Sequence, residues 1–189
     1  MLFRSARDHW QVSGVDIQAD AAAYARQHLG LDVQCGEFLE LTLPESAFDV
    51  VVMWDTIEHL AYPRQYVERI ARMLKPGGIL ALTTGDVGSL MARWRGRRWR
   101  LFYPPVHLHY FTRETLGRLF AGSGLQMVDS GHIGFYRSLD MMLYRVLVDR
   151  RPAALHPLYR AATAIGATKP MLHLDLGDIF FMTARKPPA

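Results

Sequence analysis

The sequence predicts an α/β fold built on a largely parallel sheet. Apolar runs of strand length alternate with segments of helical periodicity along most of the 189 residues. The clearest strand is the β-branched run at 48–54. The clearest helix carries an apolar stripe at helical spacing, formed by Val67, Ile70, Ala71 and Leu74. Because alternating strands and helices favour parallel pairing, we expect a single domain over residues 1–189.

The first part of the chain predicts three strands. A strand over Gln11–Ile17 precedes an alanine-rich helix over Ala19–Leu29, which Gly30 ends. A short strand at Val33–Phe38 follows. The run at 48–54 shows no polar alternation, and it therefore predicts a central strand covered on both faces.

The middle of the chain predicts a sharp turn and an insertion. Pro76 and the two glycines after it end the helix that passes through Leu74, and a strand follows at Ile79–Thr83. Residues 85–111 hold glycines, arginines, aromatics and two prolines without a clear period. We expect an irregular insertion there, near one end of the sheet.

The last third predicts two strands that enclose a helical insertion at 137–168. Thr112 is a suitable N-cap for a helix whose buried stripe includes Leu116 and Phe120. Four further elements are expected: strands at Gln126–Gly134 and Asp178–Lys186, and helices at Ser138–Asp149 and Leu155–Ala167.

Composition limits the classes of protein. Half of the residues are hydrophobic, 21% are charged and the net charge is +4, as in an ordinary globular protein. No run reaches the roughly 18 apolar residues of a membrane-spanning helix, and the first ten residues do not resemble a secretory signal. The single cysteine, Cys35, fits a reducing compartment and excludes a cysteine-rich zinc site. We therefore expect a cytoplasmic protein.

Five short motifs carry a family resemblance. In chain order they are Gly14-Val15-Asp16-Ile17, Gly36-Glu37, Phe48-Asp49-Val50-Val51, Glu58-His59-Leu60 and Leu74-Lys75-Pro76-Gly77-Gly78. With them, residues 3–134 resemble a class I S-adenosylmethionine-dependent methyltransferase of the ubiquinone-biosynthesis-like O-methyltransferase branch. The resemblance implies a Rossmann-like sheet, mostly parallel with an antiparallel last strand. It also implies methyl transfer from S-adenosyl-L-methionine to a small-molecule acceptor, with oxygen as the expected methylated atom.

The resemblance assigns cofactor-binding roles to residues at strand ends, where open α/β sheets bind ligands. Asp16 would bind the two ribose hydroxyls through its two oxygens, and Ile17 would pack on the adenine. Glu37 would meet the adenine amino group, with the backbone N–H of Phe38 near the ring. The plain alternatives are a carboxylate at a helix N-terminus for Asp16, core packing for Ile17 and a solvated loop acid for Glu37.

The acceptor side is expected beside the strand at 48–54. Trp54 and Asp55 close that strand, near where the methionine part of the cofactor would lie. A hydroxyl acceptor needs a base whose pKa lies near neutrality, for which histidine is suited. His59 and His107 are the candidate catalytic residues, with helix capping or packing as the alternative for His59.

Two other features on this side are interpreted as structural. His109 is expected to have a structural role. Glu58 and His59 could offer ligands to a cation, but two adjacent residues are no metal signature, so no metal is predicted.

The N-terminus departs from the family pattern. In related folds the strand-end acid follows a glycine-rich turn by about 20 residues, and counting back from Asp16 places that turn before residue 1. We therefore expect an N-terminally truncated methyltransferase whose first strand and glycine-rich loop are missing. The two strands ending at Asp16 and Asp55 would then close up or expose unpaired edges, with a marginal fold and weak cofactor binding.

A basic segment within the insertion leaves four interpretations open. Its arginines are Arg93, Arg95, Arg97, Arg98 and Arg100, and tryptophans stand at 94 and 99. They could grip an anionic acceptor, contact a membrane surface that suits a lipid-like acceptor, bind nucleic acid, or form a solvated helix whose tryptophans pack on the sheet. Nucleic acid is not expected as a partner.

The helical insertion also carries apolar and aromatic side chains: Phe135, Tyr136, Met141, Met142 and Tyr144. They could line an apolar acceptor pocket, although such a stripe is more typical of core packing. Three alternatives to a methyltransferase remain at this point: a catalytically inactive binding module, a nicotinamide-dependent oxidoreductase, and a peripheral membrane module acting through the basic segment. The acceptor and the oligomeric state are not defined by the sequence.

Overall fold

The computed structural model of the chain describes residues 6, 8–149 and 153–188. The elements in chain order are β1 (Ser13–Asp16), α2 (Ala19–Leu29), β2 (Asp32–Cys35), β3 (Phe48–Trp54), η1 (Ile57–His59), α3 (Pro63–Met73), β4 (Leu74–Gly85), α4 (Leu90–Arg95), η2 (Gly96–Arg98), α5 (Arg113–Gly122), β5 (Gln126–His132), β6 (Phe135–Ser138), α6 (Leu139–Leu147), η3 (Ala153–Leu155), α7 (His156–Ala164), β7 (Met171–Leu174) and β8 (Ile179–Arg185). None of the described helices has the length and apolar character needed to cross a membrane.

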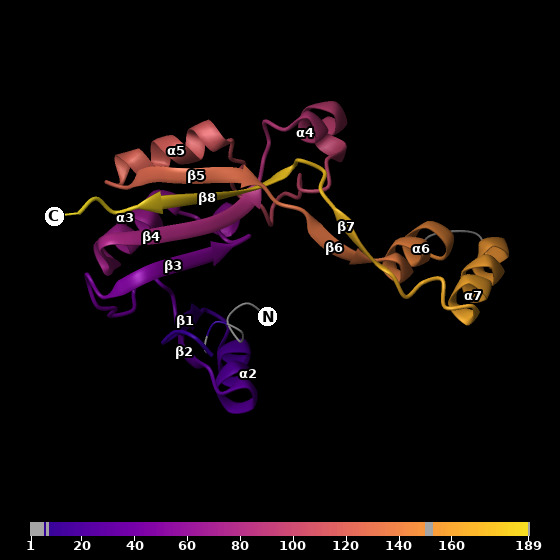
Figure 1. Ribbon diagram of the computed structural model, residues 1–189, viewed down its shortest axis with the longest axis horizontal. Coiled ribbons are helices and arrows are strands. Elements are labelled where there is room, and N and C mark those ends of the chain that lie inside the picture. The colour runs from indigo at the N-terminus through magenta and orange to yellow at the C-terminus, as the bar shows by residue number, and fades with distance from the viewer. Residues whose placement is uncertain (1–5, 7, 150–152, 189) are drawn as a thin grey trace.

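The main sheet has four strands in the order β3-β4-β8-β5. β3 pairs with β4 in parallel, whereas β8 is antiparallel to both of its neighbours. The arrows of β3, β4 and β5 point the same way, so their carboxyl ends share one edge of the sheet (Figure 1). The expected α/β class, with its antiparallel last strand, is confirmed.

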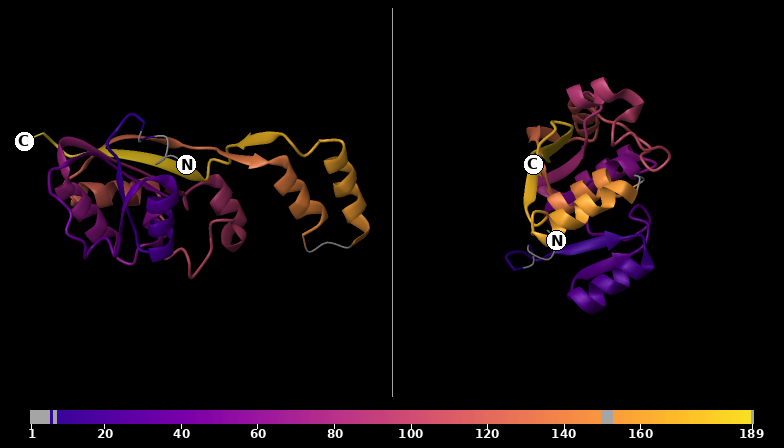
Figure 2. Two further views of the ribbon diagram at one scale, coloured as in Figure 1. Left: turned by 90° about the horizontal axis from the view of Figure 1, so that it is seen from below. Right: turned by 90° about the vertical axis from the view of Figure 1, so that its right-hand side faces the viewer.

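Two helices cover one face of this sheet and bury the core (Figure 2). Helix α3 contributes Val67 and Ile70, as its apolar stripe predicts, and α5 contributes Leu116 and Phe120. A capping box begins α5, because the Thr112 side chain accepts a hydrogen bond from the N–H of Thr115. The strands supply the opposing layer with Leu80, Leu82, Phe180, Met182 and Ala184.

The turn between α3 and β4 differs from the prediction. Helix α3 ends at Met73, and Leu74 already pairs with Phe48 at the start of β4. Gly77 has a φ of +81°, which a glycine accommodates, and a Cβ at Gly78 would lie 3.0 Å from the carbonyl oxygen of Phe48. The two glycines therefore let the chain turn tightly against β3.

The second face of the sheet is open along β3. Val50 and Val52 are 54% and 48% exposed, and Trp54 continues the same exposed row. The prediction of a strand covered on both faces was therefore wrong for β3. The β-branched run identifies the strand correctly, but coverage depends on which elements stack against it.

β1 and β2 form a separate parallel pair, which lies below β3 in Figure 1 together with α2. Within the described residues no strand lies between β1 and β3, and the two are not paired with each other. The expected unpaired edges are thus present. The loop after β2 is attached to α3, since Arg69 donates to the carbonyl oxygens of Leu39 and Leu41.

An arm formed by β6, α6, η3, α7 and β7 extends beyond the carboxyl edge of the sheet (Figures 1 and 2). β6 and β7 form an antiparallel ribbon that leads into and out of α6, η3 and α7, and these three elements lie within the expected helical insertion at 137–168. Neither α6 nor α7 has a fully buried residue among its described positions. The core interpretation of Tyr136, Met141 and Tyr144 was therefore wrong, because these side chains are exposed.

The insertion at 85–111 is more regular than expected. It contains α4 and η2, and the side chain of Ser89 caps α4 by accepting from the N–H of Ala92. The segment then returns to the edge of the sheet, where the N–H groups of Leu108 and His109 both donate to the carbonyl oxygen of Glu58.

Candidate active site

A cavity of about 300 Å³ lies at the carboxyl edge of β3 and β4, between the sheet, the insertion and the base of the arm. It is lined by Asp55, Glu58, His59, Gly85, Arg100, Leu101, His107, Phe135, Tyr136, Arg137 and Ile179. Three of the residues singled out from the sequence for cofactor binding or catalysis, Asp55, His59 and His107, therefore face one space. A volume of this size suits a small organic ligand.

Asp55 stands at the turn that follows β3. Its φ is +46°, an unfavourable conformation for a residue with a side chain, and such conformations are found at functional sites. The hydroxyl of Thr83 donates to Oδ1 of Asp55 at 2.9 Å. The neighbouring Trp54 points to the open face of the sheet and does not line the cavity.

Glu58 is 4% exposed and is held within the sheet edge. Its Oε2 accepts a hydrogen bond of 2.9 Å from the hydroxyl of Thr84. Its backbone carbonyl anchors the loop that carries His107, as described above. The glutamate therefore joins the strand end to the loop over the cavity.

His59 and His107 form an edge-to-face pair with ring centroids 4.7 Å apart. Nδ1 of His59 lies 2.9 Å from the carbonyl oxygen of Val106, and Nδ1 of His107 lies 2.7 Å from that of Leu101. A carbonyl oxygen only accepts, so Nδ1 must carry the proton in both rings. In each neutral imidazole Nε2 is consequently left as an acceptor.

The carboxylate of Glu58 and the two imidazoles also meet the spacing of a cation site. One ligand atom from each of the three lies within 4.8 Å of the others. Imidazoles whose second nitrogen is fixed by a carbonyl are common among metal ligands. The sequence showed only two adjacent ligand residues here, because the third lies 48 positions further along the chain.

Eight of the eleven residues that line the cavity were not predicted as site residues, and three of them are Phe135, Arg137 and Arg100. Phe135 was considered only as pocket lining or core, and Arg137 was not considered. Arg100 belonged to the basic segment, but nothing separated it from its neighbours. In the structure Arg100 and Trp99 turn inward to the buried Asp178, whereas Arg93, Arg95, Arg97 and Arg98 are exposed.

The basic segment is thus divided in two. Trp99 is 3% exposed and packs at the sheet edge, while Trp94 is 77% exposed on α4. The interpretation of tryptophans packed on the sheet holds for Trp99 only. Contact of the exposed part with a membrane or with an anion stays a prediction.

The residues assigned to the ribose and adenine of the cofactor lie at the end of β1 and in the loop after β2. Asp16 is in register with Cys35, so the loop that follows β2 starts beside Asp16. Oδ1 of Asp16 accepts from the N–H of Gln18 at 2.8 Å, and Ile17 beside it is exposed. In the part of the chain that the structure describes, Oδ2 of Asp16 has no hydrogen bond and is free to accept one.

Glu37 and Phe38 are positioned by α3. Oε1 of Glu37 accepts a hydrogen bond from the hydroxyl of Tyr66, and the Phe38 ring stacks on the Tyr66 ring at 5.3 Å. Burial, with the hydrogen bond to Glu37, raises the pKa of Tyr66 to about 12. These contacts attach Glu37 and Phe38 to α3, and neither residue lines the cavity between the sheet and the arm.

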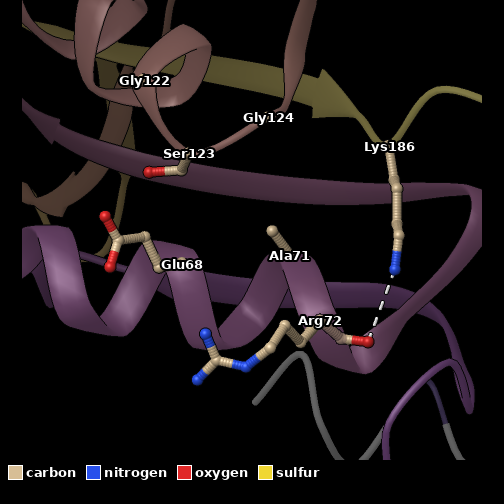
Figure 3. A pocket seen from close by; sticks show the side chains of 7 residues that line it. All are labelled: Glu68, Ala71, Arg72, Gly122, Ser123, Gly124 and Lys186. Atoms are coloured by element: carbon tan, nitrogen blue, oxygen red, sulfur yellow. Dashed lines mark hydrogen bonds between the residues drawn. The ribbon is translucent and has the colours of Figure 1, made fainter.

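A second hollow lies at the opposite edge of the sheet (Figure 3). Lys186 points into it and donates hydrogen bonds to the carbonyl oxygens of Arg72 and Leu74, at 3.4 and 2.7 Å. A lysine there stabilises the C-terminal end of α3. The hollow therefore has a structural explanation, and the cavity at the carboxyl edge remains the candidate active site.

A family profile described as a methyltransferase domain matches residues 2–130 of this chain. The ubiquinone biosynthesis O-methyltransferase of Nitrobacter winogradskyi is 32% identical over 127 residues, which cover 57% of this chain and 48% of that protein. An S-adenosylmethionine-dependent methyltransferase of Mycolicibacterium smegmatis is 36% identical over 140 residues, which cover 66% of this chain and 52% of that protein. The chain thus spans about half the length of these curated relatives.

Solved structures share the fold. A SAM-dependent methyltransferase from Archaeoglobus fulgidus superposes with a TM-score of 0.62 at 15% identity, covering 98% of this chain and 80% of that chain. Phosphoethanolamine N-methyltransferase 2 of Haemonchus contortus, in complex with S-adenosyl-L-methionine, gives a TM-score of 0.53 at 17% identity. The match covers 97% of this chain and 45% of that chain.

Proposed function

This chain belongs to the methyltransferase-domain family of class I S-adenosylmethionine-dependent enzymes, and on that premise we propose that it methylates a hydroxyl oxygen of a small molecule. The observation that carries the proposal is the pair of imidazoles over the cavity, His59 and His107, each fixed with Nε2 as an acceptor. The names of the curated O-methyltransferases support oxygen as the methylated atom.

The β1–β2 pair supplies groups that suit S-adenosyl-L-methionine. Asp16 has a free carboxylate oxygen for a ribose hydroxyl, and exposed Ile17 offers an apolar surface for a ring. Glu37, held by Tyr66, would accept from the adenine amino group. Trp54 and Asp55 would meet the methionine part. When bound, S-adenosyl-L-methionine supplies a methyl group that is already activated on a sulfonium.

The residues of the cavity then position the acceptor and remove its proton. The Nε2 atom of His59 or His107 would accept the proton of the acceptor hydroxyl, which would leave its oxygen ready to take the activated methyl group. The carbonyls of Val106 and Leu101 hold the rings in place, so little reorganisation is needed. Asp55, fixed by Thr83, is near enough to the same space to orient the hydroxyl.

Two measurements on the 189-residue chain test this proposal. Calorimetric titration with S-adenosylhomocysteine is expected to show binding in the micromolar range. Methyl-labelled S-adenosyl-L-methionine is expected to label para-hydroxybenzyl alcohol or para-hydroxybenzoate at oxygen. Absence of S-adenosylhomocysteine binding would overturn methyl transfer by this chain, and label recovered only on nitrogen compounds would overturn the choice of oxygen. We place the reaction in the cytosol, because Cys35 is a free and exposed thiol.

A further inference from the structure

The cavity is lined by two chemically different sets of side chains. One set of lining groups comprises the carboxylates of Asp55 and Glu58 with the two imidazoles, and the other comprises two guanidinium groups around one aromatic ring. Arg100 and Arg137 lie 4.5 and 5.2 Å from the centroid of the Phe135 ring, measured from Cζ. A ligand in this cavity therefore meets both proton-accepting groups and cationic groups.

Only one of the two guanidinium charges is neutralised. Nε and Nη2 of Arg100 donate to the two oxygens of Asp178 at 3.1 and 2.8 Å, a bidentate ion pair. Arg137 is half-buried, and in the described part of the chain no carboxylate lies within the 4.0 Å of an ion pair. Its one hydrogen bond is from Nη1 to Sδ of Met141 at 3.6 Å, and a thioether is a weak acceptor.

Because of this arrangement, we propose that Arg137 is a specificity residue that binds an anionic group, a carboxylate or a phosphate, on the methyl acceptor. A guanidinium has five donors in a planar fork that matches either group. The Phe135 ring, over which the guanidinium groups of Arg100 and Arg137 lie, is the aromatic surface beside this fork. The inference rests on the proposed function, since it names the substrate class of that same site.

Geometry defines the expected acceptor. Its hydroxyl would meet His59 and His107, and its anionic group would meet Arg137, since all three residues line the cavity. A cavity of about 300 Å³ accommodates a small aromatic or similar acid, and it is at the low end of the range for ligand pockets. The exposed arginines of α4 and η2 take no part, since they do not line the cavity.

The test compares two probes that differ in one group. Para-hydroxybenzoate and the neutral para-hydroxybenzyl alcohol are titrated into the full 189-residue chain by calorimetry. We expect the benzoate to bind at least about tenfold more tightly, as charge-assisted hydrogen bonds allow. In Arg137→Gln that preference is expected to disappear, whereas the matched control Arg145→Gln, at an exposed position of α6, keeps it.

Three outcomes would overturn the inference. They are equal affinities of the wild-type chain for the two probes, no binding of the benzoate, or an equal loss of the preference for the benzoate in Arg137→Gln and Arg145→Gln. Circular dichroism of each variant establishes that it is folded. Titration of the same samples with S-adenosylhomocysteine separates this inference from the proposed function, because cofactor binding does not depend on Arg137. Benzoate selectivity without cofactor binding would keep the anion site and reject methyl transfer.

Discussion

Arg100 and Asp178 form a bidentate ion pair that joins the insertion to the start of β8 across 78 positions of the sequence. The carboxylate is 1% exposed and also accepts from the indole N–H of Trp99 at 2.8 Å. Leu101 follows Arg100 directly, and His107 lies further along the same loop. The Arg100–Asp178 ion pair therefore determines where the loop over the cavity begins. Gly85 allows the approach, because a Cβ there would lie 2.8 Å from Cδ1 of Leu101.

Asp178→Asn should therefore loosen the insertion. We expect a loss of about 2 kcal/mol in the free energy of unfolding, less than for a fully buried pair because Arg100 is partly exposed. The fluorescence of Trp99 should shift to longer wavelength as water reaches the indole. Urea unfolding and emission spectra measure both effects, with the exposed Asp149→Asn as the control. Unchanged stability and emission would show that the ion pair does not hold the loop.

The two imidazoles should carry the proton transfer. Replacing His59 or His107 with glutamine is expected to lower kcat by about 100-fold, the lower range for general base catalysis. His109→Gln, in the same loop but outside the cavity, is the matched control. Steady-state rates of labelled-methyl transfer give the measurement. If chelation abolished the activity of the wild-type chain and a divalent cation restored it, Glu58, His59 and His107 would be metal ligands instead.

Sequence patterns predict local features of this fold well. The stripe through Val67 and Ile70 is a property of one helix, and it faces the core as expected. The position of Asp55 at a strand end follows from the length of the apolar run before it. What the sequence does not show is pairing between distant segments. The β6–β7 ribbon joins two four-residue strands separated by 32 residues, and neither strand has enough pattern to indicate its partner.

The same limit applies to the candidate site. Asp55 could be predicted because it ends a strand, and His59 and His107 could be predicted because imidazoles match the chemistry of proton transfer. Arg137 was missed, since a single arginine beside a predicted helix carries no signal until β6 brings it to the cavity. The exposed row on β3 was missed for a related reason, as a β-branched run indicates a strand and not what covers it.

Asp16→Asn should weaken the binding of S-adenosylhomocysteine. An amide offers one acceptor oxygen where the carboxylate offers two, and the charge-assisted hydrogen bond to a ribose hydroxyl is lost. We expect the dissociation constant to rise by about tenfold to a hundredfold. Asp20→Asn, in the first turn of the adjacent helix, provides the control for net charge. Equal affinities of wild type and Asp16→Asn would exclude Asp16 from the cofactor site.

Tyr66 should make the stability of the fold sensitive to alkaline pH. Its folded-state pKa of about 12 lies above the ordinary value of 10.0, because burial and the bond to Glu37 favour the neutral phenol. The stabilisation of the folded state by the neutral Tyr66 phenol is complete below pH 10.0, and it is lost as the pH rises toward about 12. Chemical unfolding across this range should show a steeper decline in wild type than in Tyr66→Phe. Tyr24→Phe, at an exposed position, should decline like the wild type. If the unfolding free energy of Tyr66→Phe declined with pH as steeply as that of the wild type, Tyr66 would not be the source of the alkaline sensitivity.

Neighbouring residues of β3 should respond very differently to truncation, because they face opposite sides of the sheet. Met53 packs into the core under α3 and α5, while Val52 lies on the open face. We expect Met53→Ala to cost about 2–5 kcal/mol of unfolding free energy and Val52→Ala only about 0.5 kcal/mol. Urea unfolding of the two variants at equal protein concentration gives both values. A comparable cost at Val52 would mean that the open face is covered in solution. Repeating that measurement at several protein concentrations would show whether a second copy of the chain covers it, since stabilisation by association depends on concentration.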